Sequence, residues 1–152
     1  MTPALRLSPR TREEVRTNVN AMDAATRALI SADWWAKFEQ SAVEDPWIHG
    51  FSLLLSDGTN VGLGSFKGPP TNGEVEIAYA ILPQHQGRGY ATAAARAMVD
   101  FAFRSEEVRS VIAHTLPDGA ASQRVLQKAG FRKTGEVMDP EDGLVRRFEI
   151  ER

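Results

Sequence analysis

Residues 74–104 contain the feature of the sequence that most restricts the fold. An alternating run from Glu74 to Leu82 predicts a strand, and Pro83 ends it. Two glycines follow, and from about Tyr90 to Arg104 the apolar residues recur every three or four positions, which is typical of an amphipathic helix. A strand, a short glycine-containing loop and a helix in this order indicate a sheet with helices packed on it.

The rest of the chain extends this unit into a mixed α/β or α+β domain. The other elements expected from the pattern are, in chain order, helices within Arg10–Glu44, strands at Ile48–Leu55 and Asn60–Phe66, a strand at Val108–Thr115, a helix from an Asp118 N-cap to Ala129, and strands at Phe131–Met138 and Leu144–Ile150.

Length and composition exclude several classes of protein. The chain has 152 residues, which suits a single domain over 1–152. It contains no Cys, which excludes disulfides, thiolate metal sites and a cysteine nucleophile, and its three scattered His argue against a zinc site. A net charge of −2 offers no basic surface for nucleic acid. No apolar run approaches the ~20 residues of a membrane helix, and the first residues lack a signal-peptide core, so we expect a cytoplasmic protein.

The loop between the strand and the helix is expected to bind an anion. Gly87 and Gly89 allow a ligand to approach the backbone closely, and the first amides of a helix have no partner within it. The helix dipole is positive at this end, and Arg88 adds a fixed charge, so a phosphate is the natural ligand. The spacing fits neither a P-loop nor a dinucleotide-binding loop, which argues against a kinase, an NTPase or a dehydrogenase.

Three motifs in order along the chain resemble the GNAT N-acetyltransferases. They are QGRGYA at 86–91, which resembles the acyl-CoA pyrophosphate loop, VEIAY at 75–79 with Pro83 after it, and TLPDGAASQRVLQKAGF at 115–131. Within the family, the chain looks most similar to the branch of ribosomal-protein N-terminal acetyltransferases.

This resemblance implies a GNAT fold: a mixed, twisted sheet of about six to seven strands with flanking helices. Its central parallel pair is splayed and ends near Leu82 and Thr115. The co-substrate is then acetyl-CoA, with no metal. The residues implied in cofactor binding are Ile81, Leu82, Gln86, Gly87, Arg88, Gly89, Tyr90, Ala91, Thr92, Gly119 and Ser122.

The resemblance also implies direct attack of an amine on the thioester, polarised by an N–H near Leu82. Glu76 is the first candidate for the base, Glu74 is the reserve, and His114 is a third possibility. The family often has a Tyr at the position of Leu126, so Ser122 is the candidate for hydrogen bonding to the CoA sulfur. Gly119 stands where the family usually has an Asn, and Ala78 where Gly is common.

These inferences lead to an acetyl-CoA-dependent N-acetyltransferase acting on a primary amine. The acceptor stays open among protein N-termini, polyamines, antibiotic amines and amino acids. The alternatives are a catalytically weak or inactive acyl-CoA-binding regulatory domain, and a structural protein that only retains the fold. Trp34 and Trp35 cannot both face the core squarely, so either one of them lines the acceptor site or both serve the core and its rim. A homodimer is a further expectation.

Overall fold

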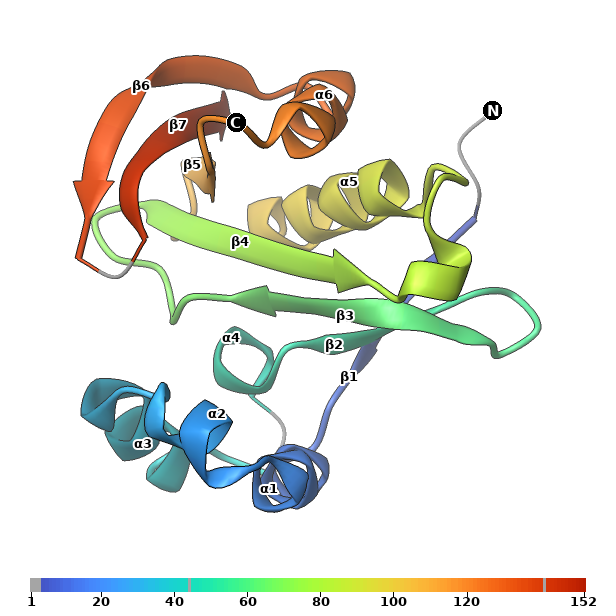
Figure 1. Cartoon of the computed structure of the whole chain (residues 1–152), viewed down its shortest axis with the longest axis vertical. Coiled ribbons are helices and arrows are strands. Elements are labelled where there is room, and N and C mark those ends of the chain that lie inside the picture. Colours follow the sequence, from blue (N-terminus) through green and yellow to red (C-terminus); the bar gives the residue numbers. More distant parts are fainter. Residues whose placement is uncertain (1–3, 44, 141) are drawn as a thin grey trace.

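The computed structural model describes residues 4–43, 45–140 and 142–152, which form one mixed sheet with helices on both of its faces (Figure 1). The strands are β1 (Arg6–Pro9), β2 (Phe51–Leu54), β3 (Asn60–Phe66), β4 (Glu74–Ile81), β5 (Ser110–Thr115), β6 (Arg132–Asp139) and β7 (Gly143–Glu151). The helices are α1 (Arg12–Ala21), α2 (Ala24–Ala28), α3 (Ala32–Glu39), α4 (Pro46–His49), the 3₁₀ turn η1 (Pro83–His85), α5 (Tyr90–Phe103) and α6 (Ala120–Lys128).

The sheet has seven strands in the order β1-β2-β3-β4-β5-β7-β6, and its central pair is splayed. β4 and β5 run parallel, whereas all other neighbouring strands are antiparallel. The β4–β5 ladder ends at the pair Glu76–Ile112, although both strands continue beyond it. The predicted fold class and the splayed central pair are therefore confirmed.

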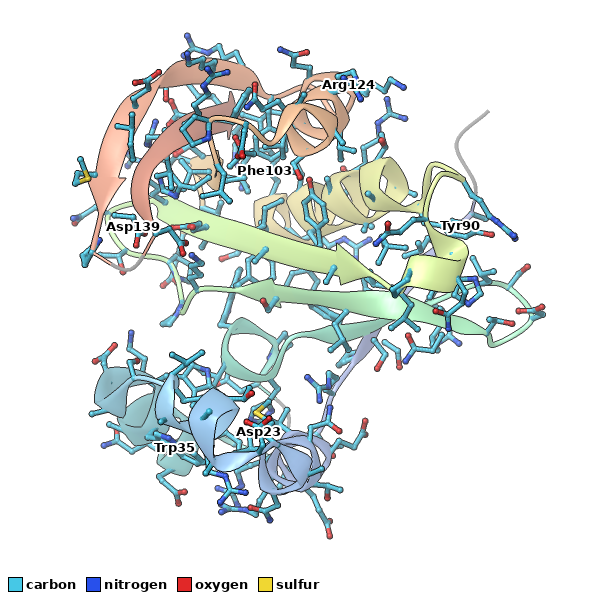
Figure 2. The ribbon with its side chains drawn as sticks, viewed as in Figure 1. Asp23, Trp35, Tyr90, Phe103, Arg124 and Asp139 are labelled. Carbon is cyan, nitrogen blue, oxygen red and sulfur yellow. The ribbon has the colours of Figure 1, made fainter. Side chains whose placement is uncertain are left out.

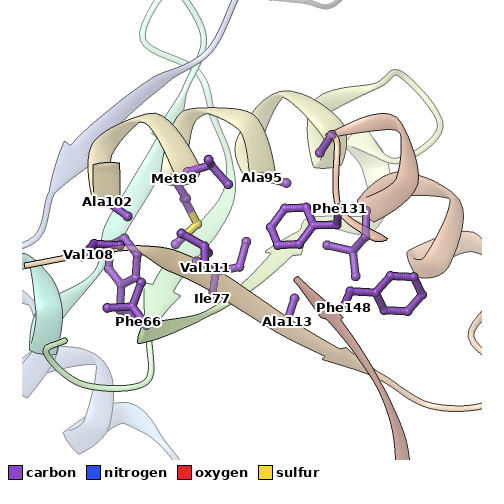
Figure 3. Packing of buried hydrophobic residues seen from close by; sticks show 14 of the residues in the cluster. Phe66, Ile77, Ala95, Met98, Ala102, Val108, Val111, Ala113, Phe131 and Phe148 are labelled. Carbon is purple, nitrogen blue, oxygen red and sulfur yellow. The ribbon is translucent and has the colours of Figure 1, made fainter. Parts of the chain in front are cut away.

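The helices divide between the two faces of the sheet. Helices α1 to α4 lie on one face, below β2 and β3 in Figure 1, and α5 and α6 lie on the other. The main core lies between α5 and the sheet, where Met98 and Ala102 of the helix pack with Val111 of β5, Phe131 and Phe148 (Figure 3). A separate, smaller core of Val15, Val19 and Phe38 holds α1 and α3 together.

Local signals placed most elements within one or two residues of their predicted ends. Asn60–Phe66 is a strand as expected, and β4, α5, β6 and β7 differ from their predicted ranges by one residue at an end. Ser31 caps α3 through a hydrogen bond from the Trp34 N–H, as predicted. The predicted end of the first helical region, Glu44, lies outside the described residues.

Three expectations were wrong. β1 has no counterpart among the predicted elements, because a four-residue strand carries little local signal and is defined by its pairing with β2. The strand expected from Ile48 begins only at Phe51, because Pro46 starts the short helix α4, and proline suits the first helical position. The N-cap of α6 is Gly119, not Asp118, and it makes no side-chain capping bond.

His49 connects the end of α4 to the small core. Its Nδ1 accepts the Asp45 N–H at 3.1 Å, and its Nε2 lies 2.9 Å from Ser41 Oγ, which itself donates to the Phe38 carbonyl. The ring is therefore neutral, with the proton on Nε2. Burial lowers the pKa of His49 below its usual value.

We predict that the free energy of unfolding falls as the pH drops below about 6.5, the ordinary pKa of His. The unfolded chain takes up a proton there, whereas native His49 resists it, so the stability present above this pH is lost below it. His49→Gln should weaken this dependence in urea titrations at several pH values, and His85→Gln should keep it. Identical pH profiles for the wild type and His49→Gln would contradict the assignment.

Candidate functional site

The open edge of β4 results from the direction of its backbone groups. The Lys67 N–H donates to the Glu76 carbonyl at 2.9 Å, and the Leu82 N–H donates to the Val61 carbonyl at 2.8 Å. Backbone groups alternate in direction along a strand, so Ile77, Tyr79 and Ile81 direct theirs away from β3 and toward the side of β5. Beyond Glu76 that side has no ladder. The Leu82 N–H itself is bonded within the sheet, so of the two neighbouring amides it is that of Ile81 that points to the open edge.

The glycine loop leads from this edge to the N-terminus of α5. Gly89 is the N-cap in the left-handed region with φ of 84°, a conformation that favours glycine, and no side chain caps the helix. The first amides of α5 therefore have no side-chain partner at their open end. The Gln86 side chain donates to the Ile81 carbonyl at 3.0 Å and holds the loop against the end of β4.

A cavity of about 590 Å³, here called the α5 cavity, lies between β4, the loop, α5 and α6. The predicted binding residues that line it are Ile81, Gln86, Gly87, Gly89, Tyr90, Ala91, Thr92 and Ser122. Figure 2 shows Tyr90 at the start of α5, beside the loop. Three predicted residues are absent from its described lining: Leu82, which is 41% exposed, Arg88 and Gly119.

Sequence reasoning missed two cations and one hydroxyl group in this cavity. Arg124 and Lys128 line it from α6, one helical turn apart, so they add positive charge beside the uncapped amides. Their spacing of four residues was the available signal. Tyr79 also lines the cavity, and burial raises its pKa to about 12. Its phenol therefore holds its proton at neutral pH.

A buried hydroxyl lies where β5 ends. Thr115 is 7% exposed, and its Oγ1 has no hydrogen-bond partner among the described residues. By strand alternation Thr115 shares the face of Val111 and Ala113, which belong to the main core on the side of α5 and α6. We call the gap between the diverging ends of β4 and β5 the fork. Buried hydroxyls normally have partners, so the β5 side of this fork is suited to a polar ligand.

Glu76 lies at the fork on the opposite face of the sheet. Its Oε2 lies 3.0 Å from Lys67 Nζ and 3.0 Å from His114 Nδ1, which brings three strands together. Because a carboxylate only accepts hydrogen bonds, His114 carries a proton on Nδ1 and its neutral form leaves Nε2 with a lone pair. Burial disfavours charge on Lys67, but the hydrogen bond and charge of Glu76, with the charge of Asp139, outweigh it and raise the Lys67 pKa.

The candidate catalytic residues do not form one cluster in the structure. Glu74 lies 2.8 Å from the Arg147 guanidinium, so this reserve carboxylate is held in an ion pair. Glu76 and Ser122 line different cavities on opposite sides of the fork. His114, the third candidate, is hydrogen bonded to the first. Trp34 and Trp35 both pack against the small core, and Trp34 also lines the cavity that contains Glu76.

The described residues form neither a metal site nor a membrane-spanning helix. Within residues 4–43, 45–140 and 142–152, no three His, Asp or Glu side chains come close enough together to hold a metal ion. Over the same described part of the chain, every helix is too short or too polar to cross a bilayer.

Comparison with known families gives one match over most of the chain. The sequence model described as acetyltransferase (GNAT) domain matches residues 3–132.

Curated relatives carry related names. The uncharacterized N-acetyltransferase YjdG of Bacillus subtilis is 34% identical over 89 residues, which are 57% of this chain and 51% of YjdG. YdaF of the same species, provisionally named a ribosomal N-acetyltransferase, is 31% identical over 74% of this chain and 59% of its own length. The chain thus spans about half the length of these relatives.

Solved structures show the same fold at low identity. The aminoglycoside acetyltransferase AAC(6')-Ib in complex with coenzyme A and kanamycin has a TM-score of 0.71 and 20% identity, covering 98% of this chain and 95% of that one. The spermidine N-acetyltransferase of Vibrio cholerae, in complex with CoA and spermine, has a TM-score of 0.71 and 15% identity, covering 97% and 95%.

The burial of Tyr79 generates a test at high pH. The unfolded phenol ionises near pH 10 and the native one near 12, so stability present below pH 10 is lost as the pH rises toward 12. The loss should reach on the order of 2–3 kcal/mol, from about 1.4 kcal/mol for each pH unit. Urea unfolding at pH 9 to 12 should show a shallower decline for Tyr79→Phe than for the wild type or Tyr90→Phe. Parallel curves would overturn the assignment.

Proposed function

Because the chain belongs to the GNAT acetyltransferase family, we propose that it transfers the acetyl group of acetyl-CoA to a primary amine. One observation carries this proposal. The fork between β4 and β5 opens the sheet between the α5 cavity on one face and Glu76 on the other. A thioester and an amine could therefore meet there from opposite sides.

The α5 cavity is suited to the CoA end of the substrate. The amides from Gly87 to Ala91 would hold the diphosphate, with Arg124 and Lys128 as cations. The pantetheine would run along the open edge of β4, where Tyr79 and Ile81 direct their backbone groups. The N–H near Leu82 expected to donate to the thioester oxygen would then be one on this edge, such as that of Ile81. A chain lying between the strand ends would also give Thr115 Oγ1 a partner.

We assign the base to the Glu76–His114 pair. An ammonium has no lone pair, so the acceptor must lose a proton before it attacks the carbonyl carbon and the C–S bond breaks. Lys67 stays protonated beside Glu76 and balances its charge, and it is therefore excluded as the base. His114, oriented by Glu76, can receive the proton on Nε2, or Glu76 can receive it through water.

The thiolate that leaves needs a hydrogen-bond donor more than a strong acid. Ser122 and Tyr79 are the two hydroxyls that we assign to this role, since both line the α5 cavity. The position where the family often has a Tyr is Leu126, which is buried in the main core.

Several expectations from the sequence stay predictions. The alternative of a catalytically weak or inactive regulatory domain is one of them: such a domain would bind acetyl-CoA and release little or no CoA with any amine. A cytoplasmic location, a single domain over 1–152 and a homodimer are likewise untested expectations, as is the absence of a nucleic-acid partner.

The loop assignment predicts that Gly89→Glu abolishes acetyl-CoA binding, because a carboxylate at the helix N-terminus would occupy the site of the diphosphate. The control is Gly58→Glu, at a hairpin glycine with a similar φ of 88° and open space around it, which imposes the same backbone strain elsewhere. At 100 times Kd, acetyl-CoA should stabilise the wild type and the control by about 2.7 kcal/mol in thermal melts. Equal stabilisation of Gly89→Glu would refute the assignment.

The base assignment predicts that Glu76→Gln lowers kcat by about 10²-fold or more at neutral pH. The deficit should shrink at high pH, where the amine loses its proton without help. Initial rates of CoA release from pH 6 to 10 measure this, with acetyl-CoA binding as the control for folding. Glu74→Gln should keep the wild-type pH profile, since Glu74 is paired with Arg147. A deficit of equal size at every pH would exclude the Glu76–His114 pair as the base.

A further inference from the structure

Two cavities adjoin on the face of the sheet covered by α1 to α4. The first, here called the Glu76 cavity, has a volume of about 490 Å³ and is bordered by Glu76, Lys67 and Asp139. The second, here called the apolar cavity, has a volume of about 420 Å³. The two share a wall formed by Ser31, Trp34, Ile48 and Ser65. A ligand that presents its amine at Glu76 can therefore extend past Trp34 into the apolar cavity.

The apolar cavity is lined mainly by hydrocarbon. Its apolar side chains come from α1, α3, α4, β3 and the segments that flank α2: Val15, Val19, Met22, Leu29, Ile30, Trp34, Ile48 and Leu63. The ionisable side chains in its described lining are Arg10 and His49. Arg10 is always charged, whereas His49 is neutral with both ring nitrogens hydrogen bonded. This cavity thus has a cation at its border and no carboxylate in its described lining.

The wall between the cavities is rigid. Trp34 stacks on the fully buried Phe38, with ring centroids 5.0 Å apart and an angle of 11° between the planes. Trp35 packs edge-on against both rings, at 5.3 Å from Trp34 and 5.8 Å from Phe38. The indole of Trp34 is therefore held in place before any ligand arrives, which favours apolar or aromatic ligands.

The carboxylates of the Glu76 cavity already have cationic neighbours. Asp33 lies 3.1 Å from Lys37, and Glu76 lies 3.0 Å from Lys67. Asp139, labelled in Figure 2 near the turn between β6 and β7, contributes to the charge that holds Lys67 protonated. Three carboxylates thus face two lysines, and Arg10 follows in the next cavity. Together, the Glu76 cavity and the apolar cavity offer little surplus negative charge to bind a polycation.

Resting on the proposed function, we infer that the acceptor is a small amine with a single primary ammonium on a hydrocarbon body. The ammonium is received at Glu76, and the hydrocarbon body fills the apolar cavity beyond Trp34. A second ammonium would lie among apolar side chains and beside the like charge of Arg10, with no carboxylate in the described lining to pair with it. For the N–H and C=O groups of a peptide, the described lining offers few polar side chains, namely Asn18, Ser31 and Ser65 besides Arg10 and His49. The acceptor class therefore differs from the kanamycin and spermine present in the structural neighbours.

The test compares hexylamine with 1,6-diaminohexane, which have equal length and similar amine basicity but differ at the far end. Acetyl-CoA turnover with each amine gives kcat/KM for the full chain, with spermine and a peptide bearing a free N-terminus measured in parallel. We expect kcat/KM for hexylamine to exceed that for the diamine by at least about tenfold, since only its methyl end suits the apolar cavity.

Leu29→Asp should weaken this preference for hexylamine. Leu29 borders the apolar cavity but is 80% exposed, so the substitution adds a carboxylate there without disturbing the core. We expect it to narrow the ratio of the two kcat/KM values by about tenfold or more. The matched control is Val43→Asp, at an apolar residue that is 68% exposed and absent from the described lining of both cavities, which should keep the wild-type ratio. The KM for acetyl-CoA should not change in either variant.

Each outcome decides the inference. A preference for hexylamine that narrows in Leu29→Asp alone supports it. Faster transfer to the diamine or to spermine than to hexylamine overturns the inferred acceptor class, and so does transfer to the peptide alone. Either result leaves the proposed acetyl transfer intact. A ratio that changes equally in both variants overturns the placement in the apolar cavity. Absence of acetyl-CoA binding and of transfer to any amine overturns the proposed function as well.

Discussion

The short ladder between β4 and β5 is the constraint on which the rest of the structure depends. The two strands share only three residue pairs, whereas β4 is held by β3 over five pairs and β5 by β7 over six. Each central strand is therefore fixed mainly by its outer neighbour, and the two outer halves of the sheet diverge beyond Glu76 and Ile112. Backbone groups that diverge in this way need water or a ligand as partners, because buried ones are rarely left unpaired.

The alternation of side chains divides the chemistry between the two faces. Glu76 and His114 point toward the side of α3 and α4, where they meet Lys67 from β3. Tyr79 and Thr115, an odd number of residues away on the same two strands, point toward α5 and α6. Two strands thus supply both the polar groups proposed for the base and the hydroxyls on the other face, with the fork as the passage between them. A shift of one residue in either register would exchange these roles.

The parts of the site that sequence could predict are those that local chemistry determines. Pro83 ends β4, Gly89 starts α5, and both lie where the pattern placed them. What could not be predicted depends on register between distant segments. Lys67, which directly follows β3, contacts Glu76, and the Leu82 N–H donates to the Val61 carbonyl. Neither contact can be predicted from the sequence around its residues. The strand predicted from Ile48 failed for a different reason, because Pro46 suits the first position of a helix and starts α4 there.

The α5 cavity and the apolar cavity also differ in how much they depend on side chains. The α5 cavity includes the start of α5, whose backbone amides many sequences can present provided that glycine occupies position 89. The apolar cavity is built instead from side chains around the small core of Val15, Val19 and Phe38. That core is separate from the main one, and α4 contacts both, since Trp47 packs on Phe66 of the main core and Ile48 packs against the small core. Substitutions around the small core can therefore reshape the apolar cavity while the fork and the α5 cavity keep their geometry, so the acceptor site that we infer would assign acceptor selection to α1 to α4.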